Sequence, residues 1–396
     1  IDIYMQRFSS MKTQTASNRT PRKINSNLVF NLVRIRQPIS RADLARASGL
    51  QRSTISLIIE DLIQSGWIVE GALDQTARGR RPTSLKINSK RVILALDIHP
   101  AQTTMAVIDV VGNIITQQIV AMPEEPTKAV NAIVRASQRI IADHISNEFV
   151  GIGICVPGRI DLHLQKLIFA PNLNWPVLSL KTSMERATGL HVEMDNVANA
   201  CALSEVWFGS SDGAHDLVVV NVAEGIGTGI FANGRLLRGE SGMAGEFGHV
   251  QLHPDGLLCS CGNRGCWETL ASNYAAVRYY IELSATDSFT RKPSFDTLLK
   301  LSQTGDETAC HAVRKMAVHL GAGIRMIAVA LSPREIVVVG DITSVWHLFG
   351  AVIESEMRKD SLTKGAILRP SSGGNTARLR SAVALVLGDA LSRTDN

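Results

Sequence analysis

The pattern of apolar residues changes near Val92, and this change constrains the fold more than any other feature of the chain. Before it, apolar residues recur every three or four positions, as in short helices; after it, runs typical of strands alternate with helical stretches. A chain of 396 residues also exceeds what one hydrophobic core usually organises. We therefore expect a small, mainly helical domain over residues 23–91 and a larger α/β domain over residues 92–396. We expect residues 1–22 to be disordered or to derive from cloning.

Basic charge is confined to the N-terminal quarter of the chain. Residues 1–91 carry 16 Lys and Arg against 6 Asp and Glu, a net charge of +10, whereas the remaining residues carry 25 against 30, or −5. This asymmetry is expected of a nucleic-acid-binding module joined to a neutral or acidic domain, although a merely solvated basic arm has the same charge. No apolar run reaches the 18 or so residues that cross a bilayer, and no secretory signal is visible, so we expect a cytoplasmic protein without membrane insertion.

Two short helices open the N-terminal domain. The first is expected over residues 24–36, ends before Pro38, and buries one apolar face: Ile24, Leu28, Leu32 and Ile35. Ser40 is expected to cap the second helix and Gly49 to end it, with Leu44 and Ala47 facing inward.

A third helix follows over residues 52–64, with four residues on its expected buried face: Ile55, Ile58, Ile59 and Leu62. Its start exposes Gln51, Arg52, Ser53, Thr54 and Ser56. This order of elements is that of a helix-turn-helix, in which the first residues of the last helix meet base edges in the major groove. Three helices that only pack together share the same pattern.

A basic hairpin behind the third helix favours DNA binding. Residues 66–69 and 84–87 are predicted strands that flank a polar tip containing Arg78, Arg80 and Arg81. Such a hairpin resembles the wing of a winged helix-turn-helix, whose arginines reach phosphates or the minor groove. The predicted partner is double-stranded DNA.

Strands dominate the larger domain. The predicted strands and helices, in order, are residues 92–98, 104–109 and 114–121 as strands, 127–146 as helix, 150–156, 216–222 and 229–232 as strands, 308–331 as helices and 336–339 as strand, with Gly112-Asn113 as a hairpin turn. Two similar β-β-β-α halves imply an α/β protein with a cleft between two lobes.

Three cysteines and a histidine have the spacing of a metal site. His249, Cys259, Cys261 and Cys266 supply one imidazole and three thiolates, a complete tetrahedral set for structural Zn²⁺ with no open position for a catalytic water. The alternative is three free thiols near a surface histidine. Six cysteines are too few for a disulfide scaffold in a chain of this length.

A long glycine-rich stretch resembles the sequence signature of the ROK family. It consists of Glu224-Gly-Ile-Gly-Thr-Gly-Ile230, Gly234, Gly239, Gly242, Ala244-Gly-Glu-Phe-Gly-His249 and the run from Cys259 to Ser272. That family groups bacterial sugar repressors, uncharacterised reading frames and sugar kinases. The resemblance covers residues 24–391 and implies an actin-like, ribonuclease-H-like fold with two lobes and a zinc-bound loop.

The resemblance also implies a sugar site. Sugar hydroxyls need paired donors and acceptors, and carboxylates and amides provide them. By similarity the contacts are Gly158, Asn172, Asn196, Glu246, His249 and Glu268. Glutamates that are merely solvated in a loop are the alternative for Glu246 and Glu268.

The residues that a ROK kinase uses for catalysis are replaced in this chain. Aligned on Ala198-Asn199-Ala200, the position of the family's catalytic aspartate is Val197, which cannot accept a proton. The first phosphate loop, Asp-x-Gly-Gly-Thr in the kinases, reads Asp97-Ile-His-Pro-Ala, and Pro100 lacks an amide donor. The double glycine on the adenosine side is reduced to Gly340-Asp341.

These losses, with the winged helix, predict a repressor of carbohydrate genes and not an enzyme. The expected partners are a pseudo-palindromic operator and a sugar or sugar-phosphate effector, with the chain acting as a homodimer or homotetramer. A protein regulator in place of a sugar stays open. The alternative function is an active ATP-dependent sugar kinase that carries a DNA-binding domain.

Overall fold

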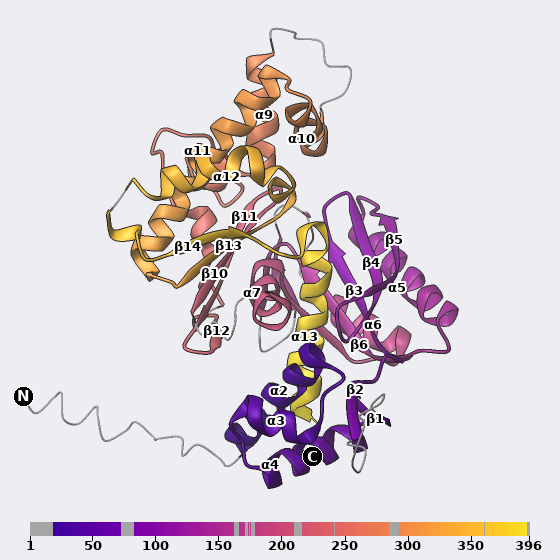
Figure 1. The fold of residues 1–396 in the computed structure, drawn as a ribbon. Coiled ribbons are helices and arrows are strands. Elements are labelled where there is room, and N and C mark those ends of the chain that lie inside the picture. Colours follow the sequence, from indigo (N-terminus) through magenta and orange to yellow (C-terminus); the bar gives the residue numbers. More distant parts are fainter. Residues whose placement is uncertain are drawn as a thin grey trace, which may run out of the picture. The chain divides into compact units, whose positions relative to one another are not determined.

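The computed structural model describes residues 19–72, 83–161, 166–170, 173, 175, 179–209, 216–240, 242–284, 293–359 and 361–393 (Figure 1). The chain forms two compact units. The first consists of Ile1–Ser89 together with Gly388–Asn396, and the second is Lys90–Leu387.

The first unit is a three-helix cluster with a small antiparallel sheet. Its elements are α2 (Arg19–Arg36), α3 (Arg41–Ser48), α4 (Arg52–Gln64), β1 (Ile68–Ala72) and β2 (Thr83–Ile87). The side chain of Ser40 accepts the amide of Asp43 at 3.2 Å, and Gly49 ends α3 at a φ of 72°, so both predicted caps are confirmed. The predicted inner face of α4 is also confirmed, because Ile55, Ile58, Ile59 and Leu62 are all buried.

The predicted inner face of α2 is wrong. Ile24, Leu28 and Ile35 are 62%, 41% and 68% exposed, whereas Val29, Phe30 and Val33 are fully buried. The helix carries two apolar stripes, and the one with the aromatic ring faces inward, where Phe30 meets Trp67 edge to face at 5.7 Å. Ala47, predicted to face inward on α3, is exposed, and only Leu44 is buried there.

Two five-stranded sheets form the framework of the second unit. The first has the order β5 (Ile114–Ala121), β4 (Gln102–Asp109), β3 (Arg91–Ile98), β6 (Glu148–Val156) and β9 (Val192–Asn196). The second has the order β12 (Arg235–Leu237), β11 (Ile226–Ala232), β10 (Leu217–Val222), β13 (Glu335–Val339) and β14 (Ile367–Pro370). In each, three antiparallel strands are followed by two parallel additions. The predicted repetition of two similar halves is confirmed.

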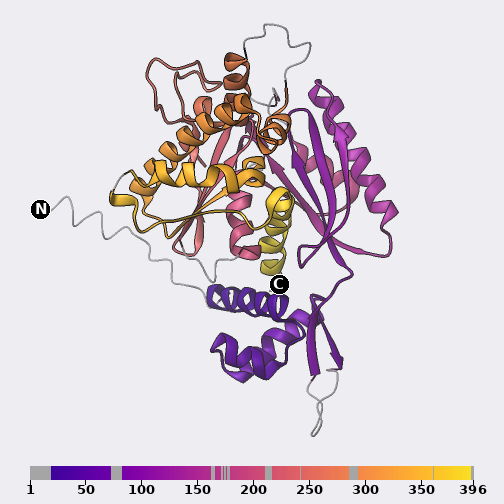
Figure 2. The ribbon, with the colours of Figure 1, turned by 45° about the horizontal axis from the view of Figure 1, so that its top comes forward.

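Helices cover both sheets. The first sheet packs against α5 (Pro126–Asp143) and α6 (Leu180–Thr188), and the second packs against α9 (Asn273–Leu283), α10 (Phe295–Gln303), α11 (Glu307–Leu331) and α12 (Trp346–Met357). Between the two sheets lie α7 (Val197–Phe208) and the first part of α13 (Ala377–Arg393), as Figures 1 and 2 both show. Residues 308–331, predicted as helices, form the single helix α11.

The remaining elements are short. They are β7 (Arg159–Asp161), β8 (Lys166–Phe169), α8 (Glu268–Ala271) and the 3₁₀ turns Glu246–His249, Asp341–Val345, Ser361–Thr363 and Gly374–Thr376.

Close backbone packing at glycines brings these layers together. A Cβ atom at Gly153 of β6 would lie 1.9 Å from the carbonyl oxygen of Ala382 in α13. At Gly229 of β11 it would lie 2.1 Å from the carbonyl oxygen of Ala198 in α7, and at Gly248 it would lie 2.1 Å from that of Ile226. No side chain fits at such distances, so these contacts require glycine.

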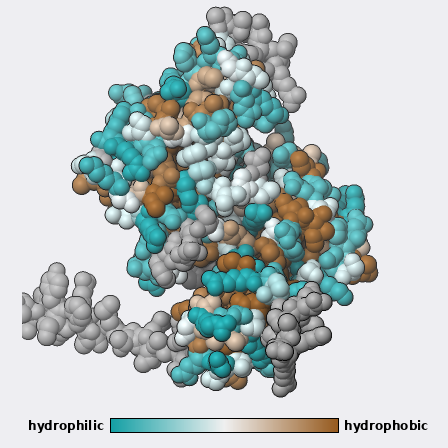
Figure 3. Space-filling model, in the orientation of Figure 1, coloured by the Kyte–Doolittle hydropathy of each residue, from teal (hydrophilic) through white to brown (hydrophobic). Residues whose placement is uncertain are grey.

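Among the described residues, no helix has both the length and the apolar character that a membrane crossing needs. Apolar side chains do reach the surface in both units, as the brown areas of Figure 3 show among the hydrophilic ones. Single exposed apolar residues are normal for a folded chain.

Candidate functional site

A cavity of about 420 Å³ lies within the second unit. Its wall comes from the ends of strands in both sheets and from the segment between β12 and α8. Five of the six predicted sugar contacts line it: Gly158, Asn196, Glu246, His249 and Glu268. The sixth, Asn172, lies outside the described residues. The volume is in the range of small-molecule sites.

Buried polar atoms without partners converge on this cavity. Within the part of the chain that the structure describes, Nε of Arg159, Oδ1 of Asn199 and Oδ1 of Asn221 have no hydrogen-bond partner, and all three residues line the cavity. Buried polar groups are normally hydrogen-bonded, and leaving one unpaired costs about 1–3 kcal/mol. The cavity is therefore built to receive a ligand or water molecules with several polar groups.

Two side chains meet across the cavity from different sheets. Asp195, at the end of β9, and Arg238, just after β12, lie with Oδ2 and Nη1 2.5 Å apart as an ion pair, without the alignment of a hydrogen bond. Burial raises the pKa of Asp195, and Arg238 opposes that shift. The pair thus links the two lobes beside the predicted sugar contacts.

Asn196 joins the start of α7 to the opposite wall. Its Oδ1 accepts the amide of Ala198 at 2.8 Å, which caps the helix, and its Nδ2 donates to the carbonyl of Gly158 at 2.7 Å. Val197, the first residue of α7, lines the cavity and is almost completely buried. An apolar side chain therefore stands where the resemblance to ROK kinases places their aspartate.

A charged network lies beside the cavity, in the segment that the resemblance assigns to the first phosphate loop. Arg378 donates from Nε and Nη2 to Oδ1 of Asp97, at 3.2 and 2.9 Å. His99 lies between Oδ2 of Asp97 at 2.9 Å and Oε1 of Glu224 at 3.4 Å. Burial and Arg378 lower the pKa of His99, but Asp97 and Glu224 outweigh them and raise it to about 9. The carboxylate of Asp97 is thus neutralised by side chains of the protein itself.

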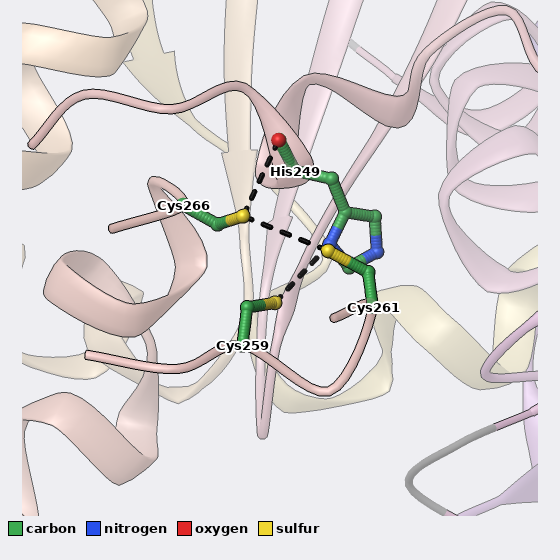
Figure 4. A group of neighbouring side chains, drawn as sticks. All are labelled: His249, Cys259, Cys261 and Cys266. Atoms are coloured by element: carbon green, nitrogen blue, oxygen red, sulfur yellow. Dashed lines mark hydrogen bonds between the residues drawn. The ribbon is translucent and has the colours of Figure 1, made fainter. Parts of the chain in front are cut away.

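The predicted metal ligands form a compact cluster. Donor atoms of His249, Cys259, Cys261 and Cys266 all lie within 4.8 Å of one another, and Figure 4 shows the four side chains turned toward a common centre. The Cys261 and Cys266 sulfurs are 3.7 Å apart, and Cys259 Sγ is 3.5 Å from His249 Nδ1. Ligands at Zn–S and Zn–N distances of about 2.3 and 2.0 Å in a tetrahedron would be separated by about 3.5–3.8 Å. The cluster can hold a metal ion.

His249 belongs to both the cluster and the cavity. Its Nδ1 faces the cysteines and lies 3.6 Å from Oε1 of Glu268, whereas its Nε2 lies 3.7 Å from Oε2 of Glu246. Burial raises the pKa of Glu246 above its usual value. A metal ligand commonly donates its second ring N–H to a carboxylate, which fixes the orientation of the imidazole.

The first unit presents the predicted DNA contacts at the start of α4. Gln51, Arg52, Ser53 and Ser56 are exposed, and Thr54 is half-buried. Arg78, Arg80 and Arg81 lie outside the described residues.

Several residues of the cavity escaped the sequence reasoning. Arg159, Arg238 and Arg378 line the cavity and have partners far away in the sequence; 281 positions separate Asp97 from Arg378, for example. Arg159 could have been predicted from its position directly after Gly158, a predicted sugar contact.

Comparison with known proteins agrees with this architecture. A family model described as "ROK family" matches residues 93–389. The chain is 30% identical over 363 residues to a protein of Bacillus subtilis named xylose repressor, covering 90% of this chain and 93% of that one.

Two solved structures extend the likeness to the fold. A ROK family transcriptional regulator, described as a homologue of the Escherichia coli MLC protein, superposes with a TM-score of 0.77 at 26% identity and covers 94% of this chain and 98% of that one. A ROK family glucokinase from Streptomyces griseus, in complex with glucose and AMPPNP, superposes with a TM-score of 0.66 at 30% identity and covers 74% of this chain and 98% of the kinase. The regulator therefore matches nearly the whole chain, whereas the kinase leaves a quarter of it unmatched. With its two repeated sheets, the cavity between them and the His–Cys cluster, this chain belongs to the ROK family.

Proposed function

We propose that this chain is a sugar-responsive transcriptional repressor of carbohydrate genes. The observation that carries the proposal is the coverage of its relatives: a transcriptional regulator and a xylose repressor match 94% and 90% of the chain, whereas the glucokinase matches 74%. The part of the chain that the transcriptional regulator matches and the glucokinase does not is similar in size to the basic N-terminal unit. As a regulator of transcription the protein would act in the cytoplasm, at the nucleoid.

The N-terminal unit is the proposed DNA-binding domain, a winged helix-turn-helix over residues 23–91. Three features support it: the net charge of +10 over residues 1–91, the order of α2, α3 and α4, and the hairpin of β1 and β2 behind α4. The proposed DNA contacts are Gln51, Arg52, Ser53, Thr54 and Ser56 from α4 and Arg78, Arg80 and Arg81 from the hairpin tip. A homodimer or homotetramer would present two such helices to a pseudo-palindromic operator.

Selection of duplexes from random DNA tests this assignment. The selected sites should contain an inverted repeat, and a truncated chain without residues 1–91 should select nothing. Arg52→Ala should lower the preference for the selected site by about 1–3 kcal/mol per lost base contact. Lys128→Ala, which removes a cation that is 75% exposed in the second unit, is the matched control and should leave the preference unchanged. Equal selection by the truncated chain contradicts the proposal.

The cavity is the proposed effector site. Its support is the group of unpartnered polar atoms together with the carboxylates and amides that line the same space: Asn196, Glu246 and Glu268. A ligand that binds only the folded state raises the melting temperature, so a thermal-shift panel of xylose, glucose and their phosphates identifies the class. Glu246→Gln should reduce the shift, and Glu125→Gln, a surface control at the start of α5, should not. A panel without any shift would favour a protein regulator in place of a sugar.

We propose that the second unit, which contains the cavity, does not catalyse phosphoryl transfer. Val197 offers no base, Pro100 lines the cavity in place of a loop amide, and Asp97 is held by Arg378 and His99. The similarity to a glucokinase keeps a DNA-bound sugar kinase as the second candidate. Incubation of the purified chain with ATP and glucose decides between them, because turnover well above background would establish the kinase.

The cluster of His249, Cys259, Cys261 and Cys266 is proposed to bind one structural Zn²⁺. Three thiolates and one imidazole fill all four tetrahedral positions, so bound zinc would hold the loop in shape and leave no site for an activated water. Metal analysis of chelator-free protein should give about one zinc per chain.

A further inference from the structure

Three arginines line the cavity, and they differ in their partners. Arg238 forms an ion pair with Asp195 at 2.5 Å, and Arg378 forms one with Asp97 at 2.9 Å. Arg159 is half-buried and forms no ion pair with any residue that the structure describes. Removing a charge from water costs free energy unless a group of opposite charge lies beside it. The positive charge of Arg159 is therefore left for a group that the chain itself does not supply.

The hydrogen bonds of Arg159 leave one edge of its guanidinium group open. Its Nη1 donates to the sulfur of Met243 at 3.0 Å, and a thioether is a weak acceptor. Its Nε is buried without a hydrogen-bond partner, and its Nη2 donates to none of the described residues. Nε and Nη2 form the edge of a guanidinium that binds both oxygens of a carboxylate or phosphate through two parallel hydrogen bonds. The open edge thus suits a bidentate anion.

The backbone around Arg159 is irregular where it meets the cavity. Gly158, just before it, has a φ of 129°, and the pairing of β7 with β8 shifts register between Arg159 and Ile160. Neighbouring residues of a regular strand point to opposite faces, yet Arg159 and Ile160 both line the cavity. An irregularity of this kind redirects a side chain. The local backbone therefore accounts for the presence of Arg159 in the cavity wall.

Arg159 lies beside the predicted sugar contacts. The carbonyl of Gly158 accepts a hydrogen bond from Nδ2 of Asn196 at 2.7 Å, and both residues line the cavity. Met243, which accepts from Nη1 of Arg159, precedes Glu246 by three positions. Amides and carboxylates such as those of Asn196 and Glu246 suffice to bind the hydroxyl groups of a neutral sugar. The guanidinium group adds a contact that hydroxyl groups do not require.

We propose that the effector is an acidic sugar derivative whose carboxylate or phosphate group binds the Nε–Nη2 edge of Arg159. This inference rests on the proposed function and names the class of effector. Carboxylates and phosphates share the chemistry that the edge recognises, which is two oxygens that carry negative charge. Arg159 is then a specificity-determining residue that favours an acidic sugar over a neutral sugar of the same shape.

Isothermal titration of the full chain with matched ligands tests this assignment. Glucose, galactose and xylose are the neutral probes, and glucuronamide is an uncharged match for glucuronate. Glucuronate, galacturonate and xylonate carry a carboxylate, whereas the 6-phosphates of glucose and galactose carry a phosphate. The best acidic ligand should have a Kd at least about 10-fold below that of its neutral counterpart. The order of uronates and phosphates identifies the source of the anionic group.

Substitution of Arg159 assigns the preference to this residue. Arg159→Gln removes the charge and should weaken binding of the acidic ligand at least about 10-fold, while binding of the neutral counterpart stays unchanged. Arg159→Lys keeps the charge without the two-donor edge and should give a smaller loss. Arg139→Gln, which replaces an exposed arginine of α5 outside the cavity, is the matched control and should change neither affinity. Melting temperatures without ligand verify that each variant is folded.

The possible failures differ in what they contradict. Tighter binding of a neutral sugar than of its acidic counterparts overturns the inference and leaves the proposed sugar effector in place. An equal loss of affinity for neutral and acidic ligands in Arg159→Gln shows that Arg159 does not bind the anionic group, and this also overturns the inference. Absence of binding by every sugar, neutral or acidic, refutes the proposed effector itself and this inference with it.

Discussion

Replacing His99 by glutamine tests the charged network at the wall of the cavity. The imidazole of His99 lies between the carboxylates of Asp97 and Glu224, which together raise its pKa to about 9 against the opposing effects of burial and Arg378. The charged form of His99 is therefore stabilised in the folded protein. Glutamine is similar in length but does not titrate.

The magnitude follows from the difference between the folded and unfolded pKa values. A folded pKa of about 9 against the ordinary histidine pKa of 6.5 means that the stabilisation is complete below pH 6.5 and is lost as the pH rises through 9. At about 1.36 kcal/mol per pKa unit, about 2–3 kcal/mol of stability remains at pH 7 and almost none at pH 10. The wild type should lose this amount between pH 7 and 10 relative to His99→Gln.

Urea unfolding at 25 °C, followed by the fluorescence of the buried Trp207 and Trp267, measures the difference. The matched control is His144→Gln, which makes the same substitution outside the network, at a ring that lies 2.8 Å from the backbone carbonyl of Ile140. A wild-type profile parallel to that of His99→Gln from pH 7 to 10 would refute the network as described.

Three further substitutions test other parts of the structure. Cys261→Ser should remove bound zinc and lower the melting temperature, and retention of a full equivalent by metal analysis would contradict the site. Val197→Asp alone should leave phosphorylation of glucose by ATP at background, since Asp97 stays bound to Arg378; a measurable rate would be evidence against this account. Gly153→Ala should destabilise the protein by at least about 2 kcal/mol in denaturant unfolding, because its Cβ would lie 1.9 Å from the carbonyl oxygen of Ala382. A loss below 0.5 kcal/mol, the usual range for a surface change, would show that α13 does not pack there as described.

Local patterns predicted the elements of the fold well. The metal ligands His249 to Cys266 fall within 18 residues of sequence, so their spacing alone predicted a cluster that the structure brings together. The strands that form the two sheets also carry their apolar runs locally. The inner face of α2 could not be predicted in this way, because its sequence has two apolar stripes and the contact of Phe30 with Trp67 joins residues far apart in the chain.

Only part of the candidate site could be predicted from the sequence, because several of its contacts join residues that are far apart in the chain. Asn196, Glu246 and Glu268 came from a resemblance and do line the cavity. Neither periodicity nor a motif predicted Arg238 and Arg378. Each forms an ion pair with a carboxylate on another element, Arg238 with Asp195 and Arg378 with Asp97. Contacts of this kind depend on the three-dimensional topology.

The glycines packed against neighbouring backbones have a consequence for what a glycine pattern says about function. Gly229 of β11 leaves room for the carbonyl oxygen of Ala198, which would lie 2.1 Å from an added Cβ atom, and Gly248 does the same for that of Ile226. Folding alone requires these glycines, since a side chain at Gly229 would separate β11 from α7. Such glycines therefore indicate the fold of the chain and not its chemistry. The chemistry depends instead on side chains that line the cavity, such as Val197.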